Sequence, residues 1–279
     1  MYGYLAFAYG VVGLVIGSFL NVVIDRVPLG KSLLRPPSHC PFCGRKLSPL
    51  ELVPVLSYLA LGGRCRTCGA SIPVRVPIVE GLTGLLFTFL YGIYGATPQL
   101  LLVTVYTCVL LAVTFIDLEH MLIPNVIILP AVVFALLTIP FQPLPSGSRS
   151  GGVLLRLLQN ARAHSGLSLL ELNGLSHLAG GMAGFLIVLS IWFVSLRLVG
   201  VDAIGFGDVK LAAFCGLIVA FPGILVVVLG SFILAGLGGV LLLTAGVVDR
   251  KTPVPFAPFL VAATFIFMVW TESLLGLFV

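Results

Sequence analysis

Long runs of apolar residues alternate with short polar stretches along nearly the whole chain. Most runs approach the roughly 20 residues that a helix needs to cross the hydrocarbon core of a bilayer, and Gly, Pro or small polar clusters separate them. This pattern predicts an all-α polytopic membrane protein. Its transmembrane helices, about eight in number, are expected near residues 4–24, 78–95, 99–116, 122–141, 177–197, 208–221, 224–246 and 256–274.

The composition agrees with this prediction. The chain has 279 residues, of which 59% are hydrophobic and 9% are charged, whereas soluble domains average about 25% charged residues. A large soluble catalytic domain is therefore excluded, and membrane lipid is the expected surrounding. The net charge of +5 is concentrated in one loop, so we interpret it as a topology signal and expect no nucleic-acid partner.

That loop lies between the first two apolar runs and carries eight basic residues against two acidic ones. The basic residues are Arg26, Lys31, Arg35, Arg45, Lys46, Arg64, Arg66 and Arg75, and the acidic ones are Asp25 and Glu51. Positively charged loops stay in the cytoplasm. We therefore expect this loop to be cytoplasmic and both chain termini to lie on the other side of the membrane.

The predicted organisation has three parts. Residues 1–24 form a first transmembrane helix, which has no cleavage site and is expected to be retained. Residues 25–77 form a small cytoplasmic loop domain, and residues 78–279 form a helical membrane bundle. Within the bundle, residues 142–176 are expected to be an extracytoplasmic loop, with a short amphipathic helix near residues 154–158.

Two CxxC pairs stand in the cytoplasmic loop, Cys40 with Cys43 and Cys65 with Cys68. This spacing is typical of a four-thiolate zinc site. Two disulfides or four unrelated thiols are the alternatives, but the reducing cytoplasm disfavours disulfides. Four sulfur ligands fill a tetrahedral coordination sphere, so the expected zinc is structural.

The segment between the two pairs contains "SPLE". Ser48 is suited to cap a helix, Pro49 to begin it, and Glu51 to return a hydrogen bond to the cap. We expect a short helix here, ending before Pro54. A loop this small buries little apolar surface, so bound metal would supply the missing stability.

Two carboxylates are expected at the cytoplasmic ends of transmembrane helices. Asp117 ends one run in "FIDLEHMLIPN", and Asp208 begins another in "GFGDVK". If the two side chains met, repulsion would leave one proton shared between them, as in aspartic peptidases. Gly205 and Gly207 would then allow close approach of a substrate backbone and positive φ.

Other interpretations of these acids stay open on the residues alone. Asp208 is also suited to cap its own helix, and Asp117 to be a solvated loop acid. A proton-coupled transporter would use both acids as a relay, although an internal repeat typical of many transporters is not visible. A zinc peptidase is disfavoured because the sequence has no HExxH motif.

Several stretches together resemble the type IV prepilin peptidases, within the GxGD intramembrane aspartic peptidases. These stretches are "GSFLNVVIDRVP" (17–28), "RPPSHCPFC" with "CRTC", "PIVEGLTGLLF" (77–87), "DLEHMLIPN" (117–125), "GFGDVKL" (205–211) and "PFAPFL" (255–260). The family often has Asp where Asn125 stands and Gly where Ala257 stands.

The resemblance implies that Asp117 and Asp208 are the catalytic pair and that the four loop cysteines bind zinc. It implies cleavage of the basic leader of type IV prepilins and type II secretion pseudopilins, at the cytoplasmic face of the bacterial inner membrane. Because the cysteine loop is usual in bifunctional members, it also implies N-methylation of the new N-terminus with S-adenosylmethionine. Glu80 matches a family acid and is a candidate for the methyl-transfer site, with helix packing as the alternative. The sequence itself has no dinucleotide-type glycine fingerprint.

Overall fold

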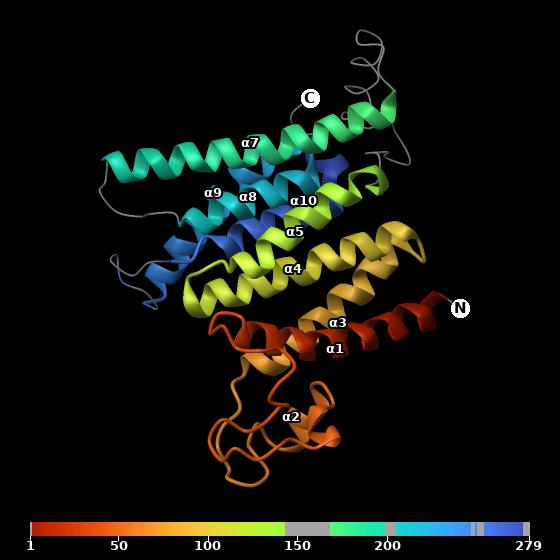
Figure 1. Cartoon of the computed structure of the whole chain (residues 1–279), viewed down its shortest axis with the longest axis vertical. Coiled ribbons are helices and arrows are strands. Elements are labelled where there is room, and N and C mark those ends of the chain that lie inside the picture. Colours follow the sequence, from red (N-terminus) through yellow and green to blue (C-terminus); the bar gives the residue numbers. More distant parts are fainter. Residues whose placement is uncertain (1, 143–167, 199–204, 247–248, 250–253, 276–279) are drawn as a thin grey trace. The chain divides into compact units, whose positions relative to one another are not determined.

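The structure is a computed structural model that describes residues 2–142, 168–198, 205–246, 249 and 254–275. These residues are almost entirely helical and contain only isolated β-bridges (Figure 1). The long helices are α1 (Tyr2–Arg26), α3 (Arg75–Tyr94), α4 (Pro98–His120), α5 (Asn125–Thr138), α7 (Leu169–Leu198), α8 (Phe206–Val219), α9 (Gly223–Thr244) and α10 (Ala257–Leu275). Each apolar run predicted to be a span therefore forms a helix.

Five of these helices, α1, α3, α4, α7 and α9, are long and apolar enough to cross a membrane. The shorter apolar segments Asn125–Phe141 and Ala257–Trp270 contain α5 and most of α10. The segment at 139–141 is a 3₁₀ turn, η2 (Ile139–Phe141), that extends α5. The prediction of an all-α, multi-pass membrane protein is confirmed.

Helix α7 begins earlier than hydrophobicity predicts. Residues 169–176, expected to belong to a loop at 142–176, are its first two turns. Ser168 and Glu171 form a capping box, in which the Ser168 backbone N–H and hydroxyl donate to the Glu171 carboxylate at 2.8 and 2.7 Å. Asn173 and His177 are polar yet buried in the helix, which lowers the apparent hydropathy of this end. Residues 143–167, including the amphipathic helix predicted near 154–158, lie outside the described residues.

The cysteine loop contains a 3₁₀ helix, η1 (Pro49–Leu52), and a short helix, α2 (Leu56–Ala60). Ser48 is the N-cap of η1, and its backbone N–H donates a hydrogen bond of 2.9 Å to Glu51 Oε2. The short capped helix that "SPLE" predicts is therefore present.

The chain divides into two compact units, residues 1–112 and residues 113–279. In the first unit α1 packs along α3. The helices approach so closely at Gly17 that an added Cβ would lie 2.7 Å from Glu80 Cα. Small residues permit this type of packing between membrane helices. It holds the start of α3 firmly against α1, next to the cysteine loop.

In the second unit α8 is the central helix and packs against α5, α7, α9 and α10. Most of its residues are buried. An added Cβ at Gly216 would lie 2.1 Å from the backbone oxygen of Gly180 in α7, so glycine is required at this crossing. Because α8 is short and central, its N-terminus lies among the surrounding helices. Asp208 is in its first turn.

Candidate active site and metal centre

Asp117 lies in the last turn of α4 and is only 6% exposed. Its Oδ2 accepts a hydrogen bond of 3.2 Å from the backbone N–H of Ala257, the first residue of α10. The carboxylate therefore caps a helix that is 140 residues away in sequence. The unpaired N–H groups at a helix start favour a negative charge, so α10 stabilises an anionic Asp117.

Asp208 lies in the first turn of α8 and is 7% exposed. Its Oδ2 accepts a hydrogen bond of 3.1 Å from the backbone N–H of Gly205, so the acid caps its own helix as one alternative predicted. Its other oxygen, Oδ1, is buried and finds no hydrogen-bond partner among the described residues. A buried carboxylate oxygen without a partner is costly, and capping alone leaves this oxygen unexplained.

The structure brings the segments that carry these two acids together. Lys210 Nζ in α8 donates a hydrogen bond of 2.5 Å to Asn125 Oδ1, at the start of α5. Gly207, also in α8, packs against Ile123, which precedes α5. An added Cβ at Gly207 would lie 3.0 Å from the Ile123 Cβ. Asp117 and Asp208 therefore belong to the same compact unit, on segments that contact each other.

The two glycines of this segment do not adopt the positive φ that was expected of them. Gly205 has φ −71° and ψ 149°, a conformation open to any residue. Gly207 is also absent from the positive-φ positions of the described residues. The observed constraint at Gly207 is steric, since an added Cβ would lie 3.0 Å from the Cβ of Ile123 and would displace it by a few tenths of an ångström. Their role in substrate approach stays a prediction.

The four loop cysteines, Cys40, Cys43, Cys65 and Cys68, form one cluster in the first unit. Their sulfur atoms all lie within 4.8 Å of one another, and the thiols are free. The sulfur atoms of Cys40 and Cys68 are 3.7 Å apart, close to the ~3.8 Å between sulfurs at tetrahedral zinc with Zn–S bonds of ~2.3 Å. The cluster fits a closed four-thiolate metal site.

Two equivalent turns present these sulfurs. In each CxxC pair the following glycine donates its N–H to the first cysteine's carbonyl, Gly44 to Cys40 at 2.9 Å and Gly69 to Cys65 at 3.0 Å. Both glycines have positive φ, 68° and 69°. This conformation favours glycine and explains why each pair is followed by that residue.

Comparison with known proteins identifies the family. Residues 11–94 match the bacterial peptidase A24 N-terminal domain, and residues 104–240 match the type IV leader peptidase family. The chain is 31% identical to the prepilin leader peptidase/N-methyltransferase of Pseudomonas aeruginosa, over 94% of this chain and 89% of the relative. The chain belongs to the type IV leader peptidase family.

Other relatives of this leader peptidase carry the same name. The prepilin leader peptidase/N-methyltransferase of Aeromonas hydrophila is 33% identical over 94% of the chain and 89% of the relative. That of Bacillus subtilis is 28% identical over 96% of the chain and 95% of the relative. No solved structure matches the chain significantly.

In this leader peptidase, Glu80 belongs to the first compact unit, whereas Asp117 and Asp208 belong to the second. It is 5% exposed, and its Oε2 accepts a hydrogen bond of 2.7 Å from the backbone N–H of Val55. Val55 has φ 61°, which is unfavourable for a β-branched residue. Glu80 thus anchors the strained start of α2 and also lines a cavity of about 990 Å³.

Two residues near the metal centre and the cavity of the first unit were not predicted. Arg45 donates two hydrogen bonds to the Glu51 carboxylate, at 3.1 and 2.5 Å. It holds the pKa of Glu51 at about 2, because the guanidinium stabilises the ionised form. Asn21 is 6% exposed in α1 and lines the same cavity as Glu80. In the sequence, Arg45 is one basic residue among several in the loop. Asn21 is a single polar residue in an apolar run.

Proposed function

We propose that this chain is an aspartic endopeptidase of the bacterial inner membrane that cleaves the basic leader from type IV prepilins or pseudopilins. The names of the relatives support the substrate class, and the basic loop at 26–75 supports cleavage on the cytoplasmic side. Asp117 and Asp208 are the proposed catalytic pair.

A single observation carries the assignment of the pair. Asp208 has a buried oxygen without a partner among the described residues, and its segment contacts the segment that follows Asp117. In the proposed reaction the ionised carboxylate takes a proton from a water molecule, whose oxygen attacks the scissile carbonyl carbon. The protonated partner donates its proton to the carbonyl oxygen. The carbon–nitrogen bond then breaks, and the leaving amine takes a proton from the pair.

A second activity, N-methylation of the new N-terminus, is part of the same proposal. The amine nitrogen would bond to the methyl carbon of S-adenosylmethionine as the carbon–sulfur bond breaks, leaving a neutral thioether, and water would take the amine proton. The N-methyltransferase names of the relatives support this activity. Glu80 is the proposed acid of the methyl-transfer site. Zinc on Cys40, Cys43, Cys65 and Cys68 would hold the loop folded.

The test is cleavage of a purified prepilin by the detergent-solubilised protein and its variants. Asp117→Asn and Asp208→Asn keep an acceptor for the capped N–H groups but cannot ionise, so each is expected to lower the cleavage rate by about 10³-fold or more. Glu119→Gln is the matched control, an exposed acid in the same turn of α4, and should cleave at the wild-type rate. Full activity of Asp208→Asn would exclude the two-aspartate mechanism.

A further inference from the structure

The outward side of the short helix α2 is apolar, although the helix belongs to the polar loop between α1 and α3. Leu56 and Leu59 are 65% and 66% exposed, and Ala60 beside them is exposed as well. Residues three and four apart lie on the same side of a helix. These three residues therefore form one surface, which we call the leucine face.

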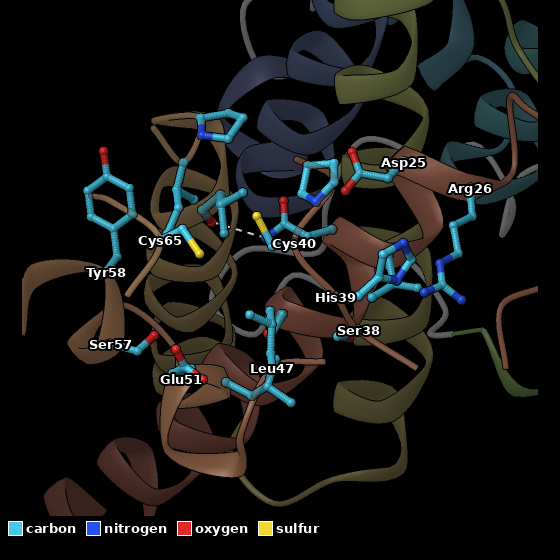
Figure 2. A pocket seen from close by; sticks show the side chains of 18 of the residues that line it. Asp25, Arg26, Ser38, His39, Cys40, Leu47, Glu51, Ser57, Tyr58 and Cys65 are labelled. Carbon is cyan, nitrogen blue, oxygen red and sulfur yellow. Dashed lines mark hydrogen bonds between the residues drawn. The ribbon is translucent and has the colours of Figure 1, made fainter. Parts of the chain in front are cut away.

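The opposite side of α2 faces the protein. Ser57, Tyr58 and Leu61 line the cavity of the first unit, and Figure 2 shows the first two among its side chains. A surface helix in water has the reverse arrangement, with its apolar stripe toward the core and its polar side outward. The exposed leucines therefore indicate that the leucine face contacts an apolar medium or partner.

The position of α2 along a membrane helix identifies that medium. The backbone N–H of Val55, which precedes α2, donates a hydrogen bond of 2.7 Å to Glu80 Oε2 in α3. Helix α3 has 20 residues, so at ~1.5 Å per residue it is ~30 Å long, as long as the hydrocarbon core is thick. Glu80 lies ~8 Å from its first residue, Arg75. Surface-bound amphipathic helices insert their apolar side ~5–10 Å into the boundary of headgroups and acyl chains, so α2 begins at a matching depth.

Charged residues near α2 in the sequence select among the possible partners. Lys46 precedes the helix, Arg64 and Arg66 follow it, and all three are exposed. The nearest acid, Glu51, is paired with Arg45. Basic residues beside a membrane are attracted to anionic lipid headgroups, whereas they would repel the basic leader of a prepilin. Charge complementarity therefore favours lipid over the substrate as the partner of the leucine face.

We propose that the leucine face docks on the bilayer that surrounds the protein, with Leu56 and Leu59 at the boundary of headgroups and acyl chains. The neighbouring basic residues then lie at anionic headgroups, and the cysteine loop rests on the membrane surface. This inference is independent of the proposed peptidase and methyltransferase activities, because it depends only on the exposure, position and charge of residues in the first unit.

The experiment measures tryptophan fluorescence of the full-length, zinc-loaded protein in lipid nanodiscs. The two tryptophans of the chain, Trp192 and Trp270, are first replaced by phenylalanine. Leu59→Trp then places a single reporter on the leucine face. Lipids with brominated acyl chains, which quench tryptophan on contact, are expected to lower its emission at least about twofold, because interfacial side chains reach the acyl boundary.

Tyr58→Trp is the matched control, since Tyr58 is the adjacent residue on the opposite side of α2 and lines the cavity. Its emission should fall by less than about 1.3-fold in the same nanodiscs. Leu56→Trp, on the leucine face, should behave like Leu59→Trp, so the result does not depend on one position. Zinc content, measured by mass spectrometry, shows that the loop of each variant is folded.

Equal quenching of Leu59→Trp and Tyr58→Trp, or quenching of neither, would overturn the docking face. An emission change of Leu59→Trp on addition of prepilin, without quenching by brominated lipid, would assign the face to the substrate instead. Quenching of Leu59→Trp should be greater in nanodiscs with anionic lipid than in zwitterionic ones. This difference should vanish in ~1 M salt, where charges are screened beyond ~3 Å, and identical quenching in both lipids at low salt would overturn the anionic surface as the partner.

Discussion

Replacing Gly207 by alanine tests whether close packing between two segments sets the geometry of the acid pair. The new Cβ would lie 3.0, 3.3 and 3.4 Å from three atoms of the Ile123 side chain. Optimal carbon–carbon separations are ~3.5–4.0 Å. The backbone at residue 207 and the Ile123 side chain must therefore move apart by about half an ångström. Overpacking of this kind costs ~1–3 kcal/mol.

The displacement should reach catalysis, because Gly207 precedes Asp208 and Ile123 lies in the turn that follows α4, whose last turn carries Asp117. A misplacement of ~1 Å costs about 10²-fold in rate. A shift of half that size is therefore expected to lower kcat/KM for prepilin cleavage about tenfold. The assay is the initial rate of leader release from purified prepilin, at equal amounts of folded enzyme.

Two further variants separate this effect from a general intolerance of alanine. Gly236 in α9 has open space around its Cβ position among the described residues, so Gly236→Ala should cleave at the wild-type rate. Combining Gly207→Ala with Ile123→Ala removes two of the three close atoms and should restore part of the lost activity. Wild-type cleavage by Gly207→Ala alone would refute the packing argument.

Three other changes have defined outcomes. Lys210→Met removes the hydrogen bond to Asn125 and should slow cleavage about three- to tenfold in the same assay, whereas Asn125→Asp retains an acceptor and should stay within about twofold. Cys40→Ser should reduce bound zinc, measured by mass spectrometry, and abolish methyl-donor binding, while cleavage per folded molecule persists; normal zinc content would contradict the metal assignment. Because Arg45 holds the pKa of Glu51 at about 2 against an ordinary 4.5, their pairing is complete above pH 4.5 and is lost as the pH falls through 2. Arg45→Gln should therefore release zinc at a higher pH than wild type in an acid titration followed with a colorimetric chelator, and coincident curves would count against this pairing.

The helices and the cysteine cluster could be predicted because their determinants are local. Apolar runs of suitable length form helices regardless of their neighbours, and each CxxC pair with its glycine builds its own turn. The early start of α7 was not predicted, because it depends on packing and not on a local pattern. Its first turns contain Asn173 and His177, which are buried by packing in the folded unit and which hydropathy assigns to a loop.

The contacts that define the acid pair depend on tertiary structure and could not be derived from spacing. Nothing near Asp117 in the sequence indicates that its partner is the N–H of Ala257. The expectation of positive φ at Gly205 and Gly207 was wrong because it assumed that both glycines lie in a turn. Gly207 is instead a close-packed helical residue, and its constraint is visible only once Ile123 is placed beside it.

The hydrogen bond between Asp117 and Ala257 joins positions 140 residues apart, and this has a consequence during biosynthesis. The ribosome must synthesise the chain through α10 before Ala257 can supply its N–H group to the acid. A nascent chain interrupted before that point would hold both aspartates but leave Asp117 without this support. The support of Asp117 should therefore be complete only after α10 has been synthesised, and a chain released earlier is expected to lack proteolytic activity.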